Sequence, residues 1–132
     1  MAATMQLEIP ARSVYVGVVR LALVSVARLA GLDEARVEDL RIAVSEACTN
    51  AVIANETDDA DDPVRVSWTE EADRIVVEII GKGSNHKPDP EDSVVGSNRF
   101  EMSIALMESL VDECTFEPLA EGGTTTRLVI EL

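Results

Sequence analysis

The chain has 132 residues, enough to bury one sizeable core, and its 46% hydrophobic content is typical of a folded globular protein rather than a disordered one. Its 25 acidic and 11 basic residues give a formal net charge of −14, which argues against nucleic acid or an anionic membrane as a partner, because both would repel such a surface. A basic protein partner, or a patch of local positive potential around the few Arg and Lys residues, fits this charge better.

Cysteine usage and hydropathy point to a cytoplasmic protein. The two cysteines, Cys48 and Cys114, lie in apolar patterns, which favours buried free thiols in a reducing compartment over a disulfide framework. Residues 1–13 lack the apolar core of a signal peptide. The most apolar stretch, residues 14–32, is interrupted by polar residues such as Arg20, so we expect an amphipathic helix there and no membrane span.

The first half of the chain predicts one strand followed by two helices. The alternating sequence MQLEIPA predicts a short strand that stops at Pro10. Ser13 is placed to cap a helix over about residues 13–30, which ends at Gly31, and Asp33 is placed to cap a second helix that reaches about Asn55. The core-facing stripe of that second helix is predicted to consist of Leu40, Ala43, Val44, Ala47 and Ala51.

The second half predicts two strands, a long loop, a helix and two more strands. VRVSWTE and RIVVEIIG have strand patterns, and EADR between them is a hairpin connection. Residues 81–98 are rich in Gly and Pro and predict one long, lid-like loop. RFEMSIALMESLVDE then has helical spacing at Phe100, Ile104, Met107 and Val111. CTFEPL and TTTRLVIEL are the last two predicted strands.

This order of elements predicts an α+β fold. Helices that alternate with short runs of strands favour a two-layer sandwich, in which the helices cover one face of a mixed sheet. No internal repeat and no linker divides the sequence, so we expect residues 1–132 to form a single domain.

Two polar residues interrupt the apolar pattern of the second helix. Glu46 and Asn50 are four residues apart, which places them about 40° apart at the edge of the core stripe. An Asn carbonyl oxygen is a suitable Mg²⁺ ligand, and a Glu can accept a proton from an attacking hydroxyl. On spacing alone, a partly exposed polar pair beside a core helix is the favoured explanation, because any soluble helix offers such pairs. GKG after one strand and EGGTTT before another are glycine-rich turns that let a backbone approach a nucleotide closely.

The ordered set of these segments resembles a known family. From about Met5 to Leu132, the chain resembles the RsbW-like and SpoIIAB-like anti-sigma factor serine kinases, a branch of the histidine-kinase/Hsp90-like (GHKL) ATPase class. EDLRIAVSEACTNAV matches the N-box segment of the family almost residue for residue, and LMESLVDE and GGTTTRL match segments that follow its lid. The resemblance implies the Bergerat-type sandwich, whose mixed sheet is mostly antiparallel.

The resemblance also implies a function. Proteins of this family are cytoplasmic bacterial regulators, often of stress responses, that sequester an alternative sigma factor and usually form homodimers. They use ATP and Mg²⁺ to phosphorylate a serine of an STAS-domain anti-anti-sigma partner, which switches the partner that they hold. By this resemblance, Glu46 is the catalytic base, Asn50 the Mg²⁺ ligand and Arg20 a partner-binding residue. Its nucleotide-binding residues correspond to Asn50, Gly81, Gly83, Gly123 and Thr124.

Several residues depart from the family pattern where ATP would bind. The strand-end motif Asp-x-Gly of the family, whose Asp binds the adenine amino group, is Gly81-Lys82-Gly83 here. The glycine-rich phosphate turn aligns with EMSI, residues 101–104, and Glu101 would repel the phosphates. We therefore expect anti-sigma binding with weakened kinase activity toward the STAS partner. A non-catalytic, ATP-independent partner-switching module, or a sensor of another ligand, is the alternative.

Overall fold

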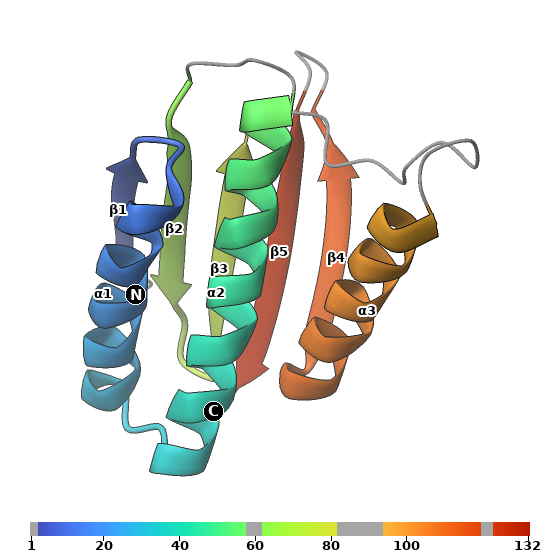
Figure 1. Ribbon diagram of the computed structural model, residues 1–132. Helices are drawn as coiled ribbons and strands as arrows, with labels where there is room; N and C mark the ends of the chain where they lie inside the picture. The colour runs from blue at the N-terminus through green and yellow to red at the C-terminus, as the bar shows by residue number, and fades with distance from the viewer. Residues whose placement is uncertain (1–2, 58–61, 82–93, 120–122) are drawn as a thin grey trace.

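Figure 1 shows the computed structural model of the chain, which describes residues 3–57, 62–81, 94–119 and 123–132. Within these residues, a five-stranded sheet forms one layer, and the helices lie side by side on one of its faces. This arrangement confirms the predicted α+β sandwich. In chain order the elements are β1 (Ala3–Ile9), the short 3-10 helix η1 (Ser13–Tyr15), α1 (Val16–Leu29), α2 (Glu34–Thr57), β2 (Val64–Glu70), β3 (Arg74–Gly81), α3 (Val94–Leu110), β4 (Glu113–Pro118) and β5 (Thr124–Glu131).

The sheet has the strand order β1-β2-β3-β5-β4, and every neighbouring pair of these strands is antiparallel. The prediction of a mixed sheet was therefore wrong for the described strands. The reason lies in the connections. The two antiparallel helices α1 and α2 join β1 to β2, so β2 starts at the end of the sheet where β1 finishes and runs in the opposite direction. Strands β3 and β4 run in the same direction, but β5 lies between them and pairs antiparallel with both.

Capping residues set the boundary between α1 and α2 as predicted. Gly31 follows α1 with a φ of 91°, a left-handed conformation that glycine adopts without strain. The Asp33 carboxylate accepts a hydrogen bond from the Arg36 backbone N–H at 2.9 Å and caps α2. The predicted cap at Ser13 was wrong, because a 3-10 turn starts there and places Tyr15 at the N-cap of α1, without a side-chain cap bond.

The third helix begins earlier than its sequence predicts. Gly81 is the last residue of β3, and α3 already starts at Val94, so the predicted loop over residues 81–98 is too long at both ends. Gly96 and Asn98 are weak helix formers, which is why their sequence favoured a loop. The rest of the predicted lid, residues 82–93, lies outside the described residues.

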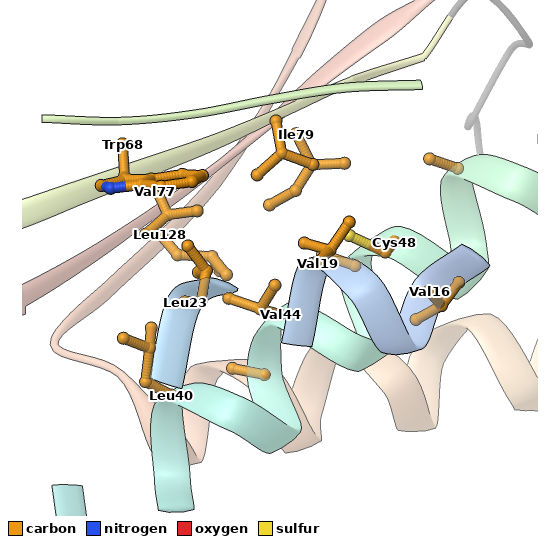
Figure 2. Packing of buried hydrophobic residues seen from close by; sticks show 14 of the residues in the cluster. Val16, Val19, Leu23, Leu40, Val44, Cys48, Trp68, Val77, Ile79 and Leu128 are labelled. Carbon is orange, nitrogen blue, oxygen red and sulfur yellow. The ribbon is translucent and has the colours of Figure 1, made fainter. Parts of the chain in front are cut away.

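The core forms between α1 and α2 and the sheet. Figure 2 shows Val19 and Leu23 of α1 pointing toward the sheet residues Val77 and Leu128, with Val44 of α2 between them. Small side chains on the inner face let α2 lie close to the strands. The predicted stripe of α2 is confirmed, since all of its members are buried: Leu40, Ala43, Val44, Ala47 and Ala51.

Both cysteines are free thiols. Cys48 lies fully buried on α2, and burial raises the pKa of its thiol to about 12, only partly offset by the positive charge of Arg20. Cys114 on β4 is half-buried, and burial raises the pKa of its thiol to about 11. Both thiols therefore stay protonated near neutral pH. None of the helices in the described part of the chain combines the length and apolar character that a bilayer crossing requires.

Candidate functional site

The predicted catalytic pair on α2 meets a serine from α3. The amide nitrogen Nδ2 of Asn50 donates a hydrogen bond to Ser103 Oγ at 2.7 Å, and Ser103 Oγ donates to Glu46 Oε2 at 3.0 Å. Asn50 and Ser103 are both buried, and Glu46 is half-buried. One hydroxyl therefore links both residues that the sequence singled out, and it does so from an element more than fifty residues away along the chain.

The segment that aligns with the phosphate turn of the family is helical. Residues 101–104 lie in the interior of α3, seven or more residues beyond its first residue. In an α-helix, backbone N–H groups at these positions donate to carbonyls one turn earlier, so they do not point toward a ligand. The Glu101 side chain is exposed on the same helix. This backbone does not offer the free amides that a glycine-rich phosphate turn provides.

The end of β3 lies directly against α2. A Cβ atom built on Gly81 would lie 3.3 Å from Ala51 Cβ and 3.3 Å from Asn55 Oδ1, closer than side chains normally pack. Asn55 is itself held, because its Nδ2 donates to the backbone oxygen of Asp62 at 2.9 Å. The position that aligns with the adenine-binding Asp of the family therefore carries a glycine, and any larger residue there would pack tightly against the adjacent helix.

The remaining predicted nucleotide residues lie at the same end of the sheet. Thr124 at the start of β5 is buried and is paired in register with Gly81. Gly123 has a φ of 96°, so this turn into β5 requires a glycine. Gly83 lies outside the described residues. The fold thus brings Gly81 and Thr124 together as neighbours on β3 and β5, and Gly81 lies against Ala51, the residue that follows Asn50 on α2.

We expect Gly81→Asp to destabilise the protein rather than to restore a nucleotide site. Overpacking against Ala51 should lower the free energy of unfolding by about 1–3 kcal/mol, measured by chemical denaturation. Gly81→Ala is the matched control, because it adds the same Cβ without the charge. An Asp variant as stable as the parent that also gains Mg-ATP binding would contradict this expectation and would identify the missing carboxylate as the only defect.

The predicted partner-binding residue lies on the other side of α2. Arg20 of α1 donates from Nε to Ser45 Oγ at 2.9 Å, which fixes the guanidinium beside α2. It lines an open hollow of about 210 Å³. The lining residues are Arg20, Arg41, Ile42, Ser45, Glu46 and Thr49. Glu46 therefore accepts the hydrogen bond from Ser103 and also lines the hollow beside Arg20.

Mg-ATP does not fit these residues in the arrangement that the structure describes. The Asn50 amide and the Glu46 carboxylate both bind Ser103, and the amides of residues 101–104 belong to a helix. Position 81 carries no carboxylate, and a Cβ atom there would already lie 3.3 Å from Ala51 Cβ and from Asn55 Oδ1. Among the described residues, no group of three or more His, Cys, Asp or Glu side chains is gathered to hold a metal ion. No catalytic step through the nucleotide follows from this geometry.

Sequence reasoning missed Ser103. Helical spacing was predicted at Phe100, Ile104, Met107 and Val111, and the side chain of Phe100 lies outside those described. Met107 is buried, but the other buried residue among the described side chains of α3 is Ser103, one turn earlier. Ile104 is only half-buried, and Val111 follows the end of the helix. The available signal was the spacing of four between Ser103 and Met107, which places a hydroxyl on the core-facing side.

Comparisons with known proteins agree with this fold and with the N-box segment. The sequence profile of the histidine kinase-like ATPase domain matches residues 9–130. Serine-protein kinase RsbW of Bacillus subtilis strain 168 is 34% identical over 118 residues, which cover 82% of this chain and 74% of that protein. Serine-protein kinase RsbW of Bacillus velezensis is 36% identical over 133 residues, which cover 93% of this chain and 82% of that protein.

A solved structure has the same fold. The crystal structure of the RsbU and RsbW domains of Rv1364c from Mycobacterium tuberculosis superposes with a TM-score of 0.71 at 21% sequence identity. The match covers 97% of this chain and 32% of that longer one. Together with the profile match over most of the sequence, these relatives show that the chain belongs to the RsbW-like serine-protein kinase family, within the histidine kinase-like ATPase domain class.

Proposed function

We propose that this protein is an anti-sigma factor that sequesters an alternative sigma factor and releases it when an STAS-domain anti-anti-sigma protein binds. Membership in the RsbW-like family supports this role. The net charge of −14 supports protein partners over nucleic acid and over anionic membranes.

The observation that carries the proposal is the outer surface of η1 and α1. Val14 of η1 and Val18 and Leu21 of α1 recur at intervals of four and three residues, and they are 75%, 49% and 72% exposed. Arg20 flanks them on the side that faces α2, with its guanidinium held by Ser45. An exposed apolar strip beside a fixed arginine has the character of a protein-binding surface.

Serine kinase activity toward the STAS partner is proposed to be weakened. The RsbW relatives are serine-protein kinases, which supports ATP and Mg²⁺ as the cofactors of the family. In this chain, the contact of Ser103 with Glu46 and Asn50 and the close approach of Gly81 to α2 both disfavour the nucleotide. The same contacts favour an ATP-independent partner-switching module as the second candidate.

The assembly and location of the protein are further parts of the proposal. Family membership supports a homodimer that works in the cytoplasm as part of a stress response, with residues 1–132 as one ATPase-like domain. In the same proposal, Glu46 is the base and Asn50 the Mg²⁺ ligand, as the corresponding N-box residues are in the family.

Partner capture tests the anti-sigma role. The purified chain, used as bait in a lysate of its own host, should retain a sigma factor or an STAS-domain protein, identified by mass spectrometry. Each captured protein is then expressed alone and titrated against the bait to obtain a dissociation constant. Failure of every sigma factor and STAS protein of the host to bind would contradict the role directly.

Nucleotide use is measured separately. Calorimetry with Mg-ATP should show binding weaker than about 1 mM, and transfer of labelled phosphate to the STAS partner should be slow. Glu46→Gln should lower any residual transfer by about 10²–10⁴-fold, because it removes the general base while keeping the shape of the side chain. Micromolar binding with rapid transfer would show instead that the kinase is fully active.

A further inference from the structure

The two edges of the sheet differ in how readily they can pair with another strand. Within the described residues, β1 and β4 are the outermost strands, so the outer side of each pairs with no other described strand. β4 ends in Pro118 and carries Glu113 and Glu117, and a proline and charged side chains both discourage edge pairing. β1 contains no proline, and its one charged residue, Glu8, is paired with Arg65 of β2 at 2.7 Å. β1 is therefore the edge that is open to a further strand.

The sequence of β1 is complementary to itself. The strand is seven residues long with Gln6 at its centre, so two copies that pair antiparallel about Gln6 use its whole length. In that register Met5 of one copy lies opposite Leu7 of the other. Glu8 lies opposite Thr4, so the two Glu8 carboxylates do not meet across the pair.

Met5 and Leu7 lie on the side of the sheet that the helices cover. They pair in register with Trp68 and Val66, which are both buried in the core. Met5 itself is 51% exposed, because no described strand lies beyond it. An added copy of β1 would place Leu7 of the second copy against this exposed side chain.

The flank of α1 that faces away from α2 is also apolar. Arg20 marks the side toward α2, because it binds Ser45. With 3.6 residues per turn, Ala22, Val26 and Leu29 lie about 180–240° around the helix from Arg20, on the opposite flank. Leu29 is 87% exposed, and Ala22 and Val26 are half-buried. Figure 1 shows α1 on the same side of the molecule as β1, so this flank adjoins the open edge of the sheet.

We propose that two copies of the chain pair antiparallel through β1 and the adjoining flank of α1, so that their two sheets join into one and their α1 helices lie side by side. The inference rests on the proposed homodimer and specifies the surface that forms it. Backbone hydrogen bonds between the two β1 strands and burial of Met5 and Leu29 favour association, whereas the net charge of −14 on each copy opposes it. A second copy fits this surface better than a basic protein does, because the one carboxylate of β1 is already held by Arg65.

Gln6→Cys tests the register of the two strands. Pairing about Gln6 places this residue opposite itself, at a separation that a disulfide spans, so mild oxidation should give a covalent dimer in non-reducing electrophoresis. Thr4→Cys is the matched control on the same strand and the same face, because its two copies would lie about 14 Å apart along the strands. It should give no more covalent dimer than the parent, whose own thiols are Cys48 and Cys114. Equal cross-linking of the two variants would contradict the register.

Leu29→Glu tests the helix flank without a cross-link. Loss of a buried leucine contact should weaken self-association by about tenfold or more in sedimentation velocity. Met102→Glu is the control, since Met102 is 71% exposed on α3 and the substitution adds the same charge away from the β1 edge. It should leave the dissociation constant of the dimer within about twofold of the parent value.

Salt distinguishes a second copy held by a neutral edge from copies held by opposite charges. Raising NaCl from about 0.1 M to 1 M should tighten self-association of the parent, because it screens the repulsion between two acidic chains. Weaker association at high salt would contradict the proposed surface.

The remaining outcomes separate this interface from the homodimer itself. A dimer that gives no disulfide in Gln6→Cys and keeps its affinity in Leu29→Glu would overturn the β1 interface and leave the homodimer standing. A parent that stays monomeric at about 1 mM and gives no disulfide in Gln6→Cys would overturn both. In either case the anti-sigma role is still decided by partner capture.

Discussion

Replacing Leu23 with alanine is expected to lower the free energy of unfolding by about 2–5 kcal/mol, the usual cost of emptying a leucine site in a closed core. Leu23 lies on the inner face of α1 and is 2% exposed, packed between α2 and the sheet (Figure 2). Little can move into the space, because the neighbouring strands are held on both sides by their sheet partners.

Chemical denaturation followed by tryptophan fluorescence measures this effect. Trp68 is the only tryptophan and is buried in β2, so its emission reports loss of the core. Leu21→Ala is the matched control: the same change on the same helix, at an exposed position, should shift stability by no more than about 0.5 kcal/mol. Equal losses in the two variants would mean that α1 does not pack as the structure describes.

Reversing the charge of Arg20 is expected to weaken partner binding by about thirtyfold or more while the protein stays folded. Removing a hot-spot arginine from a protein interface commonly costs about 2 kcal/mol or more, which corresponds to about thirtyfold in affinity. Arg20 makes its hydrogen bond to Ser45 at a half-buried position, so the fold loses only that contact. Titration of Arg20→Glu against each captured partner measures the change.

Arg65→Glu provides the control for charge alone. Arg65 lies on β2, at a position that alternates with the inward-facing Val64 and Val66, and it pairs with Glu8 of β1. The substitution changes the net charge by the same amount on the opposite face of the sheet. Equal loss of partner binding in both variants would indicate a general electrostatic effect and would remove Arg20 from the interface.

Much of the fold could be predicted because its signals are local. The strand patterns of β2 and β3, the cap at Asp33 and the glycine after α1 depend on neighbouring residues, and all of them are confirmed. The start of α3 could not be predicted, because poor helix formers at its beginning outweighed the pattern that follows. Strand directions also depend on connections that no local pattern encodes.

The sequence identified two residues of the candidate site, but it did not indicate which side chains they contact. The N-box pattern identified Glu46 and Asn50, but nothing near them in sequence indicates that Ser103 fills the space between α2 and α3. That contact depends on how α3 is rotated, which is set by the burial of Met107. Likewise, the glycine at position 81 was noted as a missing carboxylate, whereas the obstacle formed by Ala51 appears only in three dimensions.

The tight contact between Gly81 and α2 has a consequence for the order in which substitutions could be accepted. An aspartate introduced first meets Ala51, which cannot become smaller except as glycine, and a glycine in the middle of α2 would itself cost about 1 kcal/mol of helix stability. A larger residue at position 81 and the residue at position 51 are therefore coupled, so the effect of a substitution at one position depends on the side chain at the other.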